Sequence, residues 1–147
     1  MQAQQRAEVI HFEDLENYFN REDDTLYVIN FWATWCRPCV AELPFFDIVA
    51  QEHSEDPVQV LLVSLDFAEE VDGKVASYIE RRNPQSPILV LDEPNANKWI
   101  DKVAEEWTGA IPATIFVNKK QSIREFHEGD YTQEELSEKV ESLIHNP

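Results

Sequence analysis

The sequence contains no hydrophobic run long enough to cross a membrane. A membrane-spanning helix needs about 18 consecutive apolar residues, and the longest candidate, residues 58–65, is interrupted by Gln59 and Ser64. Residues 1–8 are polar and lack the hydrophobic segment of a signal peptide. We therefore expect no membrane span, and either a cytoplasmic protein or a mature form whose leader has been removed.

Basic residues are scarce. The chain has 12 lysines and arginines against 29 aspartates and glutamates, which gives a net charge of −17 at pH 7. Such a chain repels phosphate backbones, and this argues against nucleic acid as a partner. The same sign argument disfavours anionic lipid surfaces. The acidity has an ordinary explanation in solubility, so by itself it identifies no function.

Cysteine occurs only twice, at Cys36 and Cys39, which is too few for a disulfide scaffold. A zinc site would need two more ligands at close spacing, and the four histidines belong to no such cluster. We therefore expect no metal, and we interpret the two cysteines as a functional pair. The histidines are His11, His53, His127 and His145.

Glycine is also rare, with three residues, and no internal repeat or long linker divides the 147 residues. The length suits a single domain, which we place at residues 1–147. Strand-like apolar runs alternate with segments of helical spacing, which predicts an α/β fold with a mixed central sheet and helices on both faces. The expected strands are residues 9–12, 26–32, 58–67, 88–91, 113–117 and 122–127. The expected helices are residues 12–19, 36–53 (interrupted at Pro44), 71–82, 96–107 and 132–144.

The cysteine pair lies in the sequence FWATWCRPC, between a buried strand and a predicted helix. An exposed Cys36 is expected at the helix N-terminus, where unpaired N–H groups and the helix dipole favour a thiolate. Arg37 adds a nearby positive charge, and Pro38 stiffens the loop without losing a helical hydrogen bond. Cys39 lies one turn further in, where we expect it to be more buried. The pattern therefore predicts Cys36 as the nucleophile and Cys39 as the resolving cysteine.

This motif resembles the active site of thioredoxin-fold proteins, and it is most similar to the TlpA/ResA-like thiol-disulfide oxidoreductases of bacteria. Asn30 stands where typical thioredoxins have a buried aspartate, and Glu42 and Pro44 match residues of the TlpA-like branch. The stretch TGAIPAT, residues 108–114, looks like the cis-proline loop of the family. The resemblance covers about residues 8–144 and implies a thioredoxin-like three-layer fold.

The segment between the second strand-like run and the cis-proline loop is longer than in thioredoxin. Residues 69–106 resemble the helix–strand insertion of the TlpA-like branch, with residues 88–91 as the added strand. The resemblance thus implies a sheet with one more strand than thioredoxin itself has.

The resemblance also assigns supporting and binding residues. Glu42 shares a helix face with Cys39 and would either disfavour its thiolate or accept its proton, unless it is a solvated surface residue. Trp35 is either a lid or partner contact, or a half-exposed core aromatic. The Ile111–Pro112 bond is expected to be cis and to lie against the cysteine pair. That geometry would leave the Ile111 backbone free to pair with a substrate strand.

The implied activity is thiol–disulfide exchange, with reduction of protein disulfides as the first choice. The implied partners are protein thiols and disulfides and an upstream redox partner, with a monomeric chain and no organic cofactor or metal. The usual location of the family is the periplasm or another extracytoplasmic compartment. A disulfide oxidase or isomerase is one alternative, and a non-catalytic binding domain on the thioredoxin fold is another.

Two further readings of the cysteines fit the spacing less well. A peroxiredoxin would have a Pro-x-x-x-Thr-x-x-Cys arrangement, and Thr34 stands only two residues before Cys36. A Sco-like copper carrier would have one more residue between its cysteines and a paired histidine. The sequence therefore favours dithiol exchange over peroxidase or copper chemistry.

Overall fold

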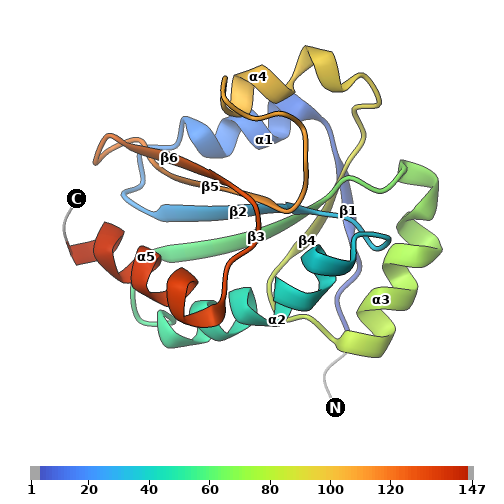
Figure 1. Cartoon of the computed structure of the whole chain (residues 1–147), viewed down its shortest axis with the longest axis horizontal. Coiled ribbons are helices and arrows are strands. Elements are labelled where there is room, and N and C mark those ends of the chain that lie inside the picture. The colour runs from blue at the N-terminus through green and yellow to red at the C-terminus, as the bar shows by residue number, and fades with distance from the viewer. Residues whose placement is uncertain (1–3, 146–147) are drawn as a thin grey trace.

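The computed structural model describes residues 4–145, and its six strands form one sheet between two layers of helices (Figure 1). The strand order is β1-β4-β3-β2-β5-β6. The first four strands in this order are parallel, β5 runs antiparallel to β2, and β6 runs antiparallel to β5. The strands are β1 (Glu8–Ile10), β2 (Leu26–Trp32), β3 (Val58–Ser64), β4 (Ile88–Leu91), β5 (Ala113–Asn118) and β6 (Ile123–Glu128).

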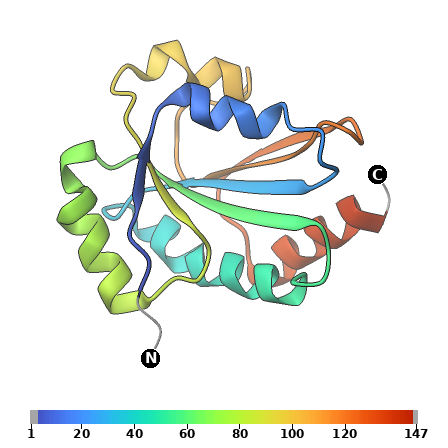
Figure 2. The same ribbon diagram turned by 180° about the vertical axis from the view of Figure 1, so that it is seen from behind.

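Helices cover both faces of the sheet, as the two opposite views show (Figures 1 and 2). On one face, α1 (Phe12–Phe19) and α4 (Ile100–Val103) bury apolar side chains against odd-numbered residues of β2. On the other face, α2 (Arg37–Glu52), α3 (Lys74–Arg82) and α5 (Gln133–His145) share a second apolar cluster. The predicted mixed α/β sheet with a layer of helices on each side is confirmed.

The central strand β2 positions the cysteines. It is buried along its whole length because it pairs with β3 on one side and β5 on the other. It ends at Trp32, and the cysteine loop follows directly. Because β5 is antiparallel to β2, its first residue lies at this same edge of the sheet, with Phe31 opposite Ala113. The residues before β5 therefore meet the start of α2.

The added strand is also where the resemblance placed it. β4 lies between β1 and β3 and pairs in parallel with both. Its four residues are all buried. The insertion is thus part of the sheet, and it brings the preceding helix α3 beside the start of α2 (Figures 1 and 2).

Two predicted boundaries are wrong near the cysteines. The α2 helix runs from Arg37 to Glu52 without a break, although Pro44 lies inside it. Pro44 is exposed, and it removes one backbone donor from the helix without ending it. Strand β3 ends at Ser64 rather than residue 67, because the chain turns there to bury Asp66 and expose Phe67.

The two predicted helices of the insertion are also shorter than expected. The first begins as a 3-10 helix, η1 (Ala68–Asp72), and becomes α3 only after Gly73. The second divides into η2 (Ala96–Lys98) and the four-residue α4. Trp99 and Trp107 are both buried, and their indole N–H groups donate to the backbone carbonyls of Glu93 and Ala110. The prediction that both tryptophans pack in the core is confirmed.

Candidate active site

The two cysteines form a disulfide at the start of α2, with their Cα atoms 5.3 Å apart. Cys36 is the residue that precedes the helix, and Cys39 lies in its first turn. Cys39 is fully buried at 0% exposure, and Cys36 is 6% exposed. Cys39 is therefore the more buried of the two, as predicted, but the expectation of an exposed Cys36 is wrong for this oxidised form.

Backbone hydrogen bonds explain why the helix begins here. The Cys36 N–H donates to the Ala33 carbonyl at 3.1 Å, and the Val40 N–H donates to the Cys36 carbonyl at 3.0 Å. Arg37 and Pro38 follow as exposed residues of the first turn, where the missing N–H of proline costs no helical hydrogen bond. The free N–H groups of this turn favour negative charge at the Cys36 sulfur.

The loop before β5 covers the disulfide. The Ile111–Pro112 peptide bond is cis, and the Ile111 carbonyl oxygen lies 3.8 Å from Cys36 Sγ. Both parts of the prediction for this loop are confirmed, although 75 residues separate the two positions. The Gly129 N–H donates to the Pro112 carbonyl at 2.8 Å and fixes the loop against the end of β6. Cys36 lies against this loop and is bonded to Cys39, and it is less exposed than expected.

Glu42 lies one turn after Cys39 and is 1% exposed. Its Oε2 atom accepts a hydrogen bond from Asn30 Nδ2 at 2.9 Å, and its Oε1 atom accepts one from the Tyr131 N–H at 2.9 Å. Burial raises the pKa of Glu42 to about 7, against the lowering effect of these two hydrogen bonds. The solvated-surface alternative is therefore wrong, and the carboxyl group can gain or lose a proton near neutral pH.

Asp66 is a site residue that the sequence reasoning missed. It is buried at the end of β3, and its carboxylate accepts hydrogen bonds from the Thr34 N–H at 3.0 Å and the Thr34 hydroxyl at 2.6 Å. The Ser64 hydroxyl donates to the same carboxylate at 2.6 Å. Asp66 thus ties the loop before Cys36 to the neighbouring strand. The available signal was an acidic residue inside the predicted apolar strand 58–67, near its end.

The tryptophans around the cysteines have different surroundings. Trp32 is buried against Tyr78, with ring centroids 4.9 Å apart. Trp35 is 67% exposed, and Phe67 on the adjacent loop is 75% exposed. Trp35 is therefore no core residue, and its role as a lid or partner contact stays a prediction. The site presents two aromatic side chains to solvent beside a nearly buried disulfide.

Within residues 4–145, no three His, Cys, Asp or Glu side chains group closely enough to hold a metal ion. Over the same residues, none of the helices has both the length and the apolar character that crossing a membrane requires.

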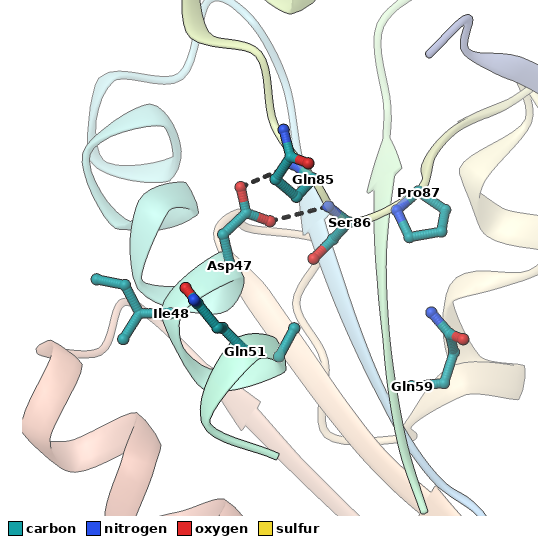
Figure 3. Close-up of a pocket in the computed structure, with 8 residues that line it drawn as sticks. Asp47, Ile48, Gln51, Gln59, Gln85, Ser86 and Pro87 are labelled. Atoms are coloured by element: carbon teal, nitrogen blue, oxygen red, sulfur yellow. Dashed lines mark hydrogen bonds between the residues drawn. The ribbon is translucent and has the colours of Figure 1, made fainter. Parts of the chain in front are cut away.

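A hollow of about 470 Å³ lies away from the disulfide, between the second half of α2 and the chain before β4 (Figure 3). Its best-defined contact is Asp47, whose carboxylate accepts hydrogen bonds from the N–H groups of Gln85 and Ser86, each at 2.9 Å. These bonds hold the α2 helix to the loop that enters β4. None of the predicted site residues lines this hollow.

Two bacterial relatives are similar in sequence over about three quarters of the chain. The thiol-disulfide oxidoreductase ResA of Oceanobacillus iheyensis is 33% identical over 74% of this chain and 52% of its own length. The sporulation thiol-disulfide oxidoreductase A of Bacillus subtilis is 31% identical over 78% of this chain and 66% of its own length. The chain thus spans about half to two thirds of the length of these curated relatives.

The fold has a solved counterpart in a thioredoxin-related protein from Neisseria meningitidis serogroup B. That crystal structure has a TM-score of 0.72 and 22% identity, and the match covers 85% of this chain and 88% of the other. Residues 5–126 match the AhpC/TSA family. This range contains both cysteines, Glu42, Asp66 and the cis-proline loop, so the site described above belongs to the matched part. On this evidence the chain belongs to the AhpC/TSA family.

Proposed function

We propose that this chain is a thiol-disulfide oxidoreductase that reduces disulfides in partner proteins. The observation that carries the proposal is the contact between two distant segments: the cis-proline loop places the Ile111 carbonyl 3.8 Å from Cys36 Sγ, at the N-terminus of α2. A structural disulfide needs no such loop beside it. The names of the sequence relatives, thiol-disulfide oxidoreductases in both cases, support the same activity.

The reaction begins from the reduced chain. The Cys36 thiolate attacks one sulfur of a partner disulfide, so that a mixed disulfide forms and the other partner sulfur leaves as a thiolate. The Cys39 thiolate then attacks the Cys36 sulfur, which forms the Cys36–Cys39 disulfide and releases the second partner sulfur. Two electrons and two protons pass from the chain to the partner. An upstream redox partner must return the same two electrons before the next cycle.

Glu42 is the proposed proton acceptor for Cys39. The second step requires a Cys39 thiolate in a buried position, and burial in apolar surroundings disfavours the charged form. Glu42 follows Cys39 by one helical turn, and its pKa of about 7 suits a base that works near neutral pH. Its neighbours Asn30 and Tyr131 donate hydrogen bonds that hold the carboxylate in place.

The partner would bind as an extended segment beside the cis-proline. Within residues 4–145, the Ile111 N–H and carbonyl form no backbone hydrogen bond. They are available to pair with a substrate strand, in the manner of an added β-strand. Trp35, exposed next to Cys36, is the proposed side-chain contact for the same segment. The exposed Arg37 and Pro38 would flank it from the first turn of α2.

The remaining features of the proposal come from the resemblance described above. We propose that the chain acts as a single domain over residues 1–147 and as a monomer, outside the cytoplasm, with the periplasm as the first choice. A cytoplasmic location is the alternative. Its substrates are protein disulfides, and its electrons come from an upstream redox partner.

An insulin reduction assay tests the activity. We expect the chain to accelerate the reduction of insulin by dithiothreitol, and Cys36→Ser to abolish the acceleration. Cys39→Ser should accumulate a mixed disulfide between Cys36 and the substrate, detectable by mass spectrometry. No turnover by the unmodified chain would contradict the proposal and favour a non-catalytic binding domain on the same fold.

The direction of electron flow is tested by a separate measurement. The Cys36–Cys39 couple is equilibrated with reduced and oxidised glutathione, and the fraction of disulfide is measured at each ratio. A reductase should have a reduction potential well below that of the glutathione couple. A potential above it would contradict the reductase assignment and favour the oxidase or isomerase alternative.

A further inference from the structure

A groove of about 540 Å³ opens directly beside the loop that precedes Cys36. One side is formed by Thr34 and Trp35, and the other by an exposed stripe of the α3 helix. Figures 1 and 2 both place α3 beside the start of α2. The helix residues in the groove are Lys74, Ser77 and Arg81, whose spacing of three and four residues puts them on one helix face.

The groove is locally cationic on a strongly acidic chain. Lys74 and Arg81 bring two positive charges, and Glu70 brings the one negative charge. The Glu70 carboxylate accepts a hydrogen bond from the backbone N–H of Lys74 at 3.3 Å. This carboxylate is therefore directed at the start of α3. Within residues 4–145, neither Lys74 nor Arg81 forms an ion pair. Their charges are therefore available to a ligand, although the whole chain carries −17.

We propose that this groove binds an acidic segment of the partner protein, next to the cysteine that exchanges with Cys36. The inference rests on the proposed function, because it names the partner that the same site selects. The exposed Trp35 ring supplies apolar contact, and Lys74 and Arg81 pair with carboxylates of the partner. An acidic patch elsewhere on the partner would meet the negative surface of this chain and be repelled.

The distances along the chain define where the acidic residues must lie. Trp35 borders the groove and is the neighbour of Cys36 in sequence, with consecutive Cα atoms about 3.8 Å apart. An extended partner segment advances about 3.3 Å per residue. Carboxylates within roughly four residues of the partner cysteine can therefore reach the groove while its sulfur is bonded to Cys36. Carboxylates further along the partner segment lie too far from the bonded sulfur to reach the groove.

Two isomeric peptides test this proposal. Each contains one cysteine joined by a disulfide to 2-mercaptoethanol, which is uncharged, and each has three glutamates. In one peptide the glutamates flank the cysteine, and in the other they lie at the distant end, so that composition and net charge are equal. Reduced chain converts each peptide disulfide to peptide thiol and 2-mercaptoethanol while Cys36 and Cys39 become the disulfide. The ratio of the two kcat/KM values is the measured quantity.

We expect the peptide with flanking glutamates to react about fivefold faster, and the combined variant Lys74→Glu and Arg81→Gln to abolish the preference. Lys119→Glu is the control, because this exposed lysine lies in the turn after β5, at the far end of the sheet, and should keep the preference. Equal rates for the two peptides, or a preference that survives the combined variant, would overturn the groove assignment. A chain that reduces neither peptide, nor the small disulfide of 2-mercaptoethanol, would contradict the proposed function instead.

Discussion

The Glu42 carboxylate accepts a hydrogen bond from the side-chain amide of Asn30 at 2.9 Å, inside the protein and one helical turn beyond Cys39. Asn30 belongs to the central strand and also donates to Thr114 Oγ1 at 3.2 Å, on the strand that begins after the cis-proline. The ionisable group is thus fixed to the same two strands that position the cysteine loop and the cis-proline loop. A change in its protonation acts on the framework of the site as well as on its charge.

The first prediction is a pH-dependent loss of stability that Glu42 causes. Burial raises the pKa of Glu42 from 4.5 to about 7, so the folded chain holds this proton more tightly than the unfolded chain does. The contribution of Glu42 to the free energy of unfolding is therefore greatest below pH 4.5. It falls by about 3 kcal/mol as the pH rises to 7. Urea unfolding, followed by tryptophan fluorescence at a series of pH values, measures the change.

The comparison of variants isolates this one titration from those of the other acidic residues. The difference in unfolding free energy between the unmodified chain and Glu42→Gln should fall between pH 4.5 and 8, because glutamine does not titrate. Parallel stability curves for the unmodified chain and Glu42→Gln would show that Glu42 keeps an ordinary pKa.

The second prediction concerns the cysteine thiols of the reduced chain. A negative charge beside a buried thiol disfavours its thiolate, so Glu42→Gln should let the Cys39 thiolate form at lower pH. The ultraviolet absorbance of the thiolate, titrated in the Cys36→Ser background, reports on Cys39 alone. If the Glu42→Gln titration curve superimposes on that of the parent, the carboxyl group does not act on this thiol.

A third prediction tests the anchor of the cysteine loop. Asp66→Ala removes the acceptor for two Thr34 donors and the buried Ser64 hydroxyl, and it should lower the free energy of unfolding by about 3 kcal/mol. Thr34→Val removes only one hydroxyl bond and should cost about 1 kcal/mol. Both variants should slow insulin reduction, because the loop before Cys36 loses hydrogen bonds that hold it beside the end of β3. The effect of Asp66→Ala should be the larger one. Unchanged stability in both variants would remove Asp66 from the site.

Much of the architecture could be predicted because it follows from local pattern. The run of residues 26–32 is apolar except for Asn30, as expected of a strand buried on both faces, and β2 has those bounds. Thr132 and Glu135 have the spacing of a capping box, and their reciprocal hydrogen bonds, at 3.1 and 2.8 Å, begin α5. The cis bond before Pro112 came from the resemblance alone, since no local pattern distinguishes it from other prolines.

The features that the sequence did not predict depend on contacts between distant segments. Cys36 is nearly buried, and one of its contacts is the Ile111 carbonyl, which lies 75 residues away in sequence. The role of Asp66 requires Thr34 to lie opposite the end of β3, which only the pairing of β2 with β3 determines. The break in the predicted helix 96–107 accompanies the packing of Trp99 and Trp107 against Phe31 of the central strand. None of these contacts is present in a local stretch of sequence.

The last prediction is an asymmetry between the two thiols of the reduced chain. Cys36 precedes the helix, where free N–H groups favour the thiolate, whereas Cys39 is fully buried in the first turn. Iodoacetamide should therefore modify Cys36 at least about tenfold faster than Cys39 at pH 7. The Cys36 reaction should also slow when a substrate peptide occupies the cis-proline loop. Quenched samples, digested and quantified by mass spectrometry, give both rates, and the urea-unfolded chain supplies the reference in which the two thiols react equally. Equal rates in the folded chain would contradict the assignment of Cys36 as the attacking thiol, because the two cysteines would then differ neither in access nor in charge.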